Sequence, residues 1–178
     1  IYGLVGGVVS IFASLKTVFT VATQRFMNIE IGRGDLKELN RVFNVSVLVN
    51  LLLAGIFIII VEIGGIWLLE NKLQIDPERM TAARWVLQFS VLAATINILN
   101  IPYSANIIAR EKMGVFAAVS IYDAVAKLAI VLLLPFLGGD RLIIYGLLML
   151  LVVCSNLLIE VLYCRLKFFE SKWHRFSH

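Results

Sequence analysis

The stretch VFNVSVLVNLLLAGIFIIIVEIGGIWLL at residues 42–69 decides the fold class, because Glu62 is its single charged residue. A transmembrane helix needs about 20 mostly apolar residues, since the hydrocarbon core is about 30 Å thick and each helical residue rises about 1.5 Å. The stretch is long enough to cross a membrane with some tilt. Its continuous apolar character favours a helix, because the strands of a membrane barrel alternate in polarity over about ten residues.

Four further apolar runs have a similar length, at residues 2–23, 82–101, 115–136 and 142–164. Of the 178 residues, 60% are hydrophobic and 16% are charged. Soluble domains are about 45–50% apolar and about 25% charged, so the composition indicates lipid as the solvent. The sequence therefore predicts an all-α fold, a polytopic bundle of five transmembrane helices followed by a tail segment at residues 165–178.

Turn and capping residues separate these runs. Asp35 followed by Glu38 is a capping-box pattern, which predicts a short amphipathic helix leading into the second run. Pro102 directly follows the third run, where proline commonly marks the end of a helix.

The basic residues in the connections divide unequally between the two sides of the predicted bundle, ten against four. Cytoplasmic loops are enriched in Lys and Arg, so the richer side is predicted to be cytoplasmic, together with the tail. The poorer side contains Lys72, Arg79, Arg84 and Arg141. The richer side contains Arg25, Arg33, Lys37, Arg41, Arg110, Lys112, Arg165, Lys167, Lys172 and Arg175.

The first predicted span begins at the very start of the sequence, where Ile1 opens the apolar run without a charged segment before it. This orientation also requires the first span to enter from the outside. We therefore expect the natural N-terminus to lie upstream, with one further helix that starts in the cytoplasm.

Several functional classes are not indicated by the sequence. It contains no phosphate-binding glycine loop, no zinc-ligand spacing and no nucleophile–base arrangement, so we expect neither an enzyme nor a cofactor or metal site. The net charge of +4 arises from loop residues, which leaves no basic face for nucleic acid.

Two lysines lie inside predicted spans, where a charge usually faces a cavity or a partner. Lys127 follows Asp123 by four residues, so both side chains share one face of a helix. This pair has two interpretations: a structural ion pair, or a lysine that contacts an anionic substrate while Asp123 tunes it. Lys16 shares a face with Ala13 and Thr20, and it either snorkels to the interface or faces a polar lumen.

The third run has a small and polar stripe that contains Asn97 and Asn100 and ends at Ser104. Such stripes are more often helix-packing seams than binding sites, but the two amides are candidate substrate-binding groups. Glu160 lies toward the inner end of the fifth run, where placement at the membrane interface would account for it.

Two groups of segments resemble bacterial polysaccharide flippases of the O-antigen type. The first group, ATQRF at 22–26, GRGD at 32–35 and LNRVF at 39–43, resembles the loop after the second helix of these proteins. The second group, PYSANIIAREKM at 102–113 and SIYDAVAKL at 120–128, resembles the loop after their fourth helix and the segment that follows.

These flippases belong to the multidrug/oligosaccharidyl-lipid/polysaccharide exporter superfamily. The resemblance implies two six-helix lobes with alternating access around a central cavity. The five spans would then be helices 2–6 of the N-terminal lobe, without the first helix and the second lobe.

The resemblance also implies a substrate and a location. The substrate would be an oligosaccharide linked to undecaprenyl pyrophosphate, flipped across the bacterial inner membrane without any bond being made or broken. A lumen cation, Lys16 or Lys127, would attract the anionic head group. Two alternatives stay open: a multidrug cation antiporter of the same superfamily, and a membrane scaffold for glycan-assembly enzymes that transports nothing.

Overall fold

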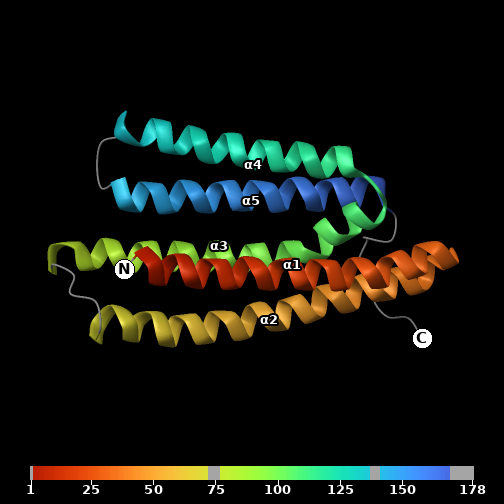
Figure 1. Cartoon of the computed structure of the whole chain (residues 1–178), viewed down its shortest axis with the longest axis horizontal. Helices are drawn as coiled ribbons and strands as arrows, with labels where there is room; N and C mark the ends of the chain where they lie inside the picture. Colours follow the sequence, from red (N-terminus) through yellow and green to blue (C-terminus); the bar gives the residue numbers. More distant parts are fainter. Residues whose placement is uncertain (1, 72–76, 137–140, 169–178) are drawn as a thin grey trace.

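The computed structural model describes the backbone of residues 2–71, 77–136 and 141–168, and the side chains within 17–65, 80–136 and 141–168. Successive helices run in opposite directions along the long axis of the molecule (Figure 1). Within these ranges the chain has no strand, so the predicted all-α bundle is confirmed. The elements are α1 (Tyr2–Arg33), α2 (Leu36–Asn71), α3 (Pro77–Ala109), α4 (Met113–Leu133), the 3-10 turn η1 (Leu134–Phe136) and α5 (Arg141–Lys167).

Four of the described helices are long and apolar enough to cross a membrane. They contain the predicted second to fifth spans, and their apolar segments are Leu36–Gly65, Met80–Ala109, Met113–Phe136 and Arg141–Lys167. The first predicted span lies in α1, whose side chains are described only from Thr17 onward. The structure therefore supports a membrane protein by helix length and composition.

The turn between α1 and α2 follows directly from its sequence. Gly34 has a φ of 73°, a left-handed conformation that glycine adopts without a Cβ penalty. The Gly34 N–H donates to the Ile31 carbonyl and the Asp35 N–H to the Glu30 carbonyl, at 3.1 and 3.3 Å, which is the Schellman pattern of helix termination. Asp35 then caps α2, because its Oδ1 accepts from the N–H groups of Lys37 and Glu38 at 3.0 and 3.1 Å. The predicted amphipathic segment is thus the first part of α2 and is continuous with the span.

The turn between α3 and α4 has the same pattern of hydrogen bonds without a glycine. The Glu111 N–H donates to the Ile108 carbonyl at 2.9 Å, and the Lys112 N–H donates to the Ile107 carbonyl at 3.1 Å. Glu111 occupies the left-handed position with a φ of 56°. This conformation is strained for a residue with a Cβ atom, so the packing around the turn must hold it in place.

Pro102 lies inside α3, although its position in the sequence suggests the end of a span. The helix continues to Ala109, and Pro102 is fully buried. Proline is tolerated in membrane helices where neighbouring helices pack around the interrupted backbone. The C-terminal part of α3 bends away from the direction of its first part, toward the start of α4 (Figure 1). A proline in the helix interior accounts for such a bend.

Two clusters of buried apolar side chains lie at the end of the bundle that holds the α1–α2 and α3–α4 turns. α3 contacts each of the other four helices and forms the centre of the bundle. Met27, Leu39 and Phe43 pack with Ala105 and Ala109, which joins α1, α2 and α3. A second cluster, Ile107 with Cys164 and Phe168, joins α3 to the end of α5. This end of the bundle is therefore closed by side chains.

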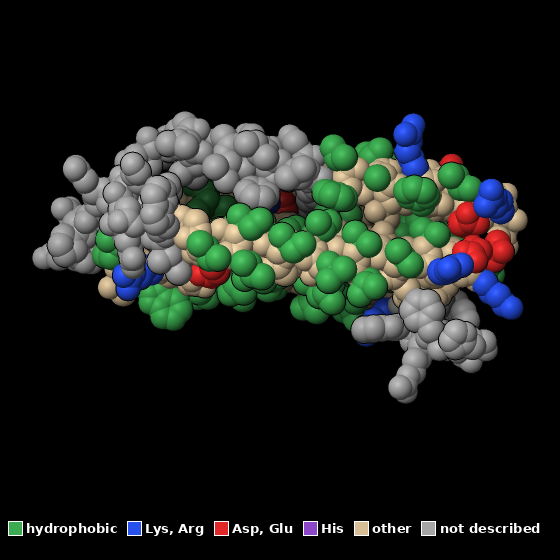
Figure 2. Space-filling model, turned by 90° about the horizontal axis from the view of Figure 1, so that it is seen from below, with side chains coloured by type: hydrophobic (Ala, Val, Ile, Leu, Met, Phe, Trp, Pro, Cys, Tyr) green, Lys and Arg blue, Asp and Glu red, His purple; other side chains and the backbone are tan. Residues whose placement is uncertain are grey.

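The surface is apolar along the middle of the bundle and charged at the closed end (Figure 2). On α2 the exposed side chains include Leu48, Leu52, Ile56, Ile60 and Ile63. A soluble monomer rarely exposes a continuous apolar surface of this kind, whereas lipid tails would cover it.

Candidate functional site

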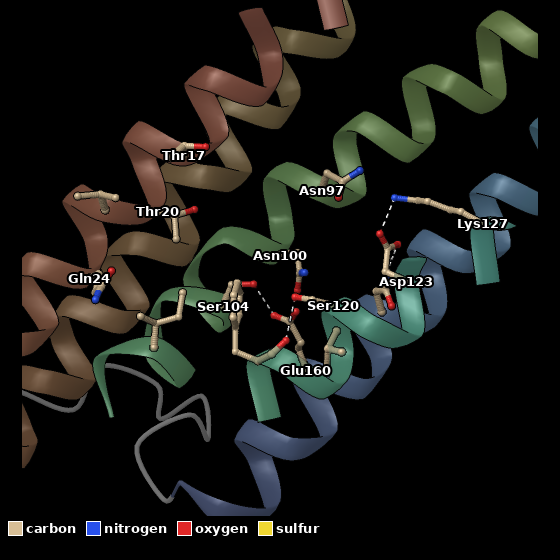
Figure 3. A pocket seen from close by; sticks show the side chains of 15 residues that line it. Thr17, Thr20, Gln24, Asn97, Asn100, Ser104, Ser120, Asp123, Lys127 and Glu160 are labelled. Atoms are coloured by element: carbon tan, nitrogen blue, oxygen red, sulfur yellow. Dashed lines mark hydrogen bonds and ion pairs between the residues drawn. The ribbon is translucent and has the colours of Figure 1, made fainter. Parts of the chain in front are cut away.

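A polar cavity of about 430 Å³ lies among four of the five helices. Its volume falls within the range of about 300–1,000 Å³ that is typical of small-molecule sites. Side chains from α1, α3, α4 and α5 point toward it in Figure 3. The lining residues are Thr17, Thr20, Val21 and Gln24 of α1, Asn97, Asn100, Ser104 and Ile108 of α3, Phe116, Val119, Ser120, Asp123 and Lys127 of α4, and Asn156 and Glu160 of α5.

The cavity is open between α1 and α4. In the described part of the chain these two helices do not contact each other, although both pack against α3. The closed end of the bundle lies beyond the cavity along α3, since Ala105 and Ala109 follow the lining residues Asn100 and Ser104. The site is therefore a groove on one side of the bundle, with α3 and α5 as its floor.

Asp123 and Lys127 form an ion pair in this groove. The Lys127 Nζ donates to the Asp123 Oδ2 at 2.6 Å, as the spacing of four residues allows. The side chain of Lys127 is 43% exposed and that of Asp123 is 28% exposed, so both remain accessible from the groove. The Lys127 ammonium has three N–H donors, so donors remain for another ligand.

Asn156 is a third member of this arrangement that the sequence did not indicate. Its Nδ2 donates to the Asp123 Oδ1 at 2.7 Å, which ties α4 to α5. Asp123 thus accepts from two helices with its two carboxylate oxygens. The register of α5 against α4 is a tertiary property, so spacing within one helix gives no sign of this contact.

The two predicted asparagines of α3 both line the groove. The Asn97 Nδ2 donates to the Ala93 carbonyl at 3.0 Å. Asn100 is 5% exposed, and its Oδ1 has no hydrogen-bond donor among the described residues. A buried acceptor without a donor is unfavourable, and it indicates a place where water or a ligand can bind.

Glu160 also lines the groove, although the sequence did not indicate its neighbours there. It is 4% exposed, and its Oε2 accepts from the Ser104 Oγ at 2.6 Å. This length is typical of a hydroxyl bound to an ionised carboxylate. The hydropathy of the sequence gives the position of Glu160 along α5. It does not define which neighbouring helix the side chain faces.

Lys16 lies in α1, one residue before the lining residue Thr17, and its side chain is outside the described residues. Of the five predicted site residues, the structure thus brings Asp123, Lys127, Asn97 and Asn100 into one groove. No three His, Cys, Asp or Glu side chains within the described ranges are close enough to hold a metal ion.

No protein-family model, curated protein or solved structure matches the chain. The resemblance to polysaccharide flippases therefore rests on the motifs within residues 22–43 and 102–128.

Proposed function

We propose that the chain is part of a membrane transporter that flips a lipid-linked oligosaccharide across the bacterial inner membrane for polysaccharide or lipopolysaccharide synthesis. The observation that carries this proposal is a polar groove, with an ammonium partly exposed in it, inside a bundle of membrane-spanning helices. Polar groups at membrane depth are unfavourable, and they usually mark a substrate pathway. The bundle presents charged, amide and hydroxyl side chains along one such path.

The groove suits an anionic head group whose lipid tail stays outside. The free N–H donors of Lys127 and the side chains of Asn97 and Asn100 would bind phosphate and sugar oxygens. The tail of an undecaprenyl pyrophosphate carrier would lie in the bilayer and enter through the open side between α1 and α4. Flipping of this kind makes and breaks no bond, so the groove needs only binding and release.

Transport also needs a second structure that opens and closes the groove. In transporters built from repeats, one bundle moves against another around a central site. We propose that a second lobe, together with a further helix, covers the open side of the groove. The C-terminal end of α5 would then face the cytoplasm, as the distribution of basic residues suggests.

The second candidate function is the export of a cationic compound by the same fold. It is favoured by the two carboxylates in the groove, Asp123 and Glu160, against the single described ammonium of Lys127. A cation would replace Lys127 as the partner of Asp123.

The two candidates can be separated with the full-length protein in lipid vesicles. A fluorescent lipid-linked oligosaccharide would be added, and its arrival in the opposite leaflet followed by quenching. We expect transport of this lipid and none of a cationic dye, and the reverse result would favour cation export.

The same assay tests the role of Lys127. Loss of a hydrogen bond to a charged group is worth about 1.5–3 kcal/mol, so Lys127→Ala should lower the flipping rate at least about tenfold at equal protein amounts. Lys112→Ala removes an exposed loop cation outside the groove and serves as the control. Equal rates for Lys127→Ala and wild type would contradict the proposed contact.

A further inference from the structure

The chemistry of the groove changes along its length. Helices α3 and α4 run in opposite directions, so the lining residues late in α4 lie level with the lining residues that come first in α3 (Figure 1). Lys127 and Asn97 therefore belong to the far end of the groove, away from the closed end of the bundle. Phe116 and Ser104 belong to the near end, next to the closed end. The near end thus combines an aromatic ring with hydroxyl, amide and carboxyl groups, and the ammonium lies at the far end.

The aromatic ring at the near end is exposed. Phe116 of α4 is 39% exposed and lines the groove among polar side chains. The face of an aromatic ring is negative, and the C–H groups on one face of a sugar ring are slightly positive, so the two faces attract each other. Their contact also removes apolar surface from water. A ligand with an apolar face and polar edges therefore fits the near end.

Asn100 provides an independent observation. The residue is 5% exposed, and its Oδ1 accepts from no donor among the described residues. An amide holds an acceptor next to a donor, and its terminal torsion is soft, so both groups can turn toward a ligand. Two neighbouring hydroxyls of a sugar match this pair, because one donates to the oxygen while the other accepts from the nitrogen. A phosphate diester has only acceptors and cannot satisfy the amide oxygen.

The hydroxyl groups around Asn100 use their own hydrogens within the bundle. The Ser104 Oγ donates to the Glu160 Oε2 at 2.6 Å. The Ser120 Oγ donates to the Phe116 carbonyl at 2.9 Å. Both hydroxyl oxygens keep lone pairs, so they are available to a ligand as acceptors. The near end therefore requires a ligand that brings several donors, and the hydroxyls of a sugar are such donors.

We propose that the near end of the groove is a carbohydrate subsite, in which Phe116 packs against one face of a neutral sugar ring and Asn100 binds a pair of neighbouring sugar hydroxyls. The phosphate groups stay with Lys127 at the far end. This inference rests on the proposed function for the anionic lipid to which the sugar is attached. It adds that the protein recognises the sugar itself and not only the charge of the head group.

The length of the groove determines the probe for a test. Phe116 and Lys127 are eleven residues apart, which corresponds to about 16 Å along α4. A pyrophosphate followed by two sugar rings spans roughly this distance. A disaccharide linked to an isoprenyl pyrophosphate can therefore reach Phe116 while its phosphates contact Lys127.

The test measures binding of three lipid probes to the full-length protein in nanodiscs. All three are diesters of isoprenyl pyrophosphate, so they carry the same charge. The first has a glucose disaccharide, the second has the same disaccharide with fluorine in place of its ring hydroxyls, and the third has a methyl group. Wild type should bind the first probe about tenfold more tightly than the second, because the second cannot donate hydrogen bonds. Contact of a ring with Phe116 should add about fivefold for both disaccharides over the methyl probe.

Two variants separate the two contacts. Asn100→Leu removes the amide and should lower the affinity for the first probe about tenfold, without lowering that for the other two. Its melting temperature should not fall, because the amide oxygen has no donor in the described bundle. Phe116→Ala should lower the affinity for both disaccharide probes about fivefold and leave binding of the methyl probe as in wild type.

Each variant has a matched control outside the groove. Asn50 of α2 is also a buried asparagine, 2% exposed, and its Nδ2 donates to the Ser46 carbonyl at 2.8 Å. Phe136 is an exposed phenylalanine in η1. Neither residue lines the groove. Asn50→Leu and Phe136→Ala should therefore discriminate among the three probes as wild type does.

Equal affinities of wild type for the three probes would overturn the inference. So would losses of affinity in Asn100→Leu or Phe116→Ala that are the same for all probes. Should Asn100→Leu fail to fold, Phe116→Ala decides, and an unchanged affinity for the disaccharides in that variant contradicts the subsite. If the protein flips lipid-linked sugars but does not distinguish the probes, this inference fails and the proposed function stands. If no probe binds, both fail.

Discussion

The ammonium of Lys127 and the carboxylate of Asp123 are supported by a third residue on another helix. Asn156 donates to Asp123, and its own Oδ1 has no donor among the described groups. An amide can rotate to present either its oxygen or its nitrogen to the same neighbour. Asn156 could therefore accept from a cation at position 123 as readily as it donates to an anion there.

This property makes the exchange of the two charges informative. Lys127→Ala alone leaves the Asp123 charge without its ammonium, and should destabilise the protein by less than the about 3–5 kcal/mol typical of a fully buried pair, because both groups are partly exposed. Asp123→Lys combined with Lys127→Asp should restore the melting temperature.

The flipping rate of the exchanged protein separates the two roles of the pair. If Lys127 binds the substrate, the exchanged protein should fold normally and transport slowly, because the ammonium has moved by one helical turn. Normal flipping by the exchanged protein, measured in the vesicle assay, would leave the pair as a structural feature only.

Glu111 offers a prediction about stability that is independent of the groove. Glu111 has a left-handed conformation, which costs a residue with a Cβ atom about 1–2 kcal/mol. Glycine avoids this cost, but it makes the unfolded chain more flexible, which offsets part of the gain in stability. Glu111→Gly should therefore stabilise the protein by up to about 1 kcal/mol. Gly34→Ala at the equivalent position of the α1–α2 turn should have the opposite effect, and thermal unfolding in detergent would measure both.

At the scale of the helices, α3 is the element on which the others assemble. Ala105 and Ala109 allow α1 and α2 to approach it closely, as small residues commonly do between membrane helices. The bend after Pro102 directs the following turns toward α4 and so positions Ser104 opposite Glu160. The groove thus depends on the packing of residues that do not line it.

Overpacking at Ala105 tests this dependence. Ala105 is 0% exposed, so Ala105→Leu adds three carbon atoms where no space exists and should destabilise the protein by about 1–3 kcal/mol. Ala118 on the exposed surface of α4 is the control, and Ala118→Leu should be close to neutral. Similar unfolding temperatures for the two variants would argue against close packing at Ala105.

For the whole molecule, the apolar segments of the helices could be predicted because they depend mainly on transfer of each segment into lipid. The ends of the helices could not, since α1 continues to Arg33 and α3 extends from Pro77 to Ala109, beyond the predicted spans. The rotation of each helix about its axis could not, as Glu160 and Asn156 show. α5 is apolar on nearly all sides, so its sequence does not reveal which face packs against α3 and α4. The same limit applies to Pro102, whose effect on α3 is decided by the helices around it.

The arrangement of the turns predicts how the bundle lies in the membrane. The α1–α2 turn, the α3–α4 turn and the end of α5 lie at one end of the bundle (Figure 1). The basic residues at or next to them are Arg33, Lys37, Arg110, Lys112, Arg165 and Lys167. Cytoplasmic loops are enriched in Lys and Arg, so this end should face the cytoplasm.

Single cysteines can test this orientation in intact cells. The background needs Cys154→Ala and Cys164→Ser, since serine keeps a donor where the Cys164 Sγ lies 3.8 Å from the Tyr103 carbonyl. With a membrane-impermeant thiol reagent, Gln74→Cys should be labelled from outside, whereas Lys37→Cys should react only after the cells are opened. Labelling of position 37 in intact cells would show that the predicted orientation is wrong. The substrate would then enter the groove from the opposite side of the membrane.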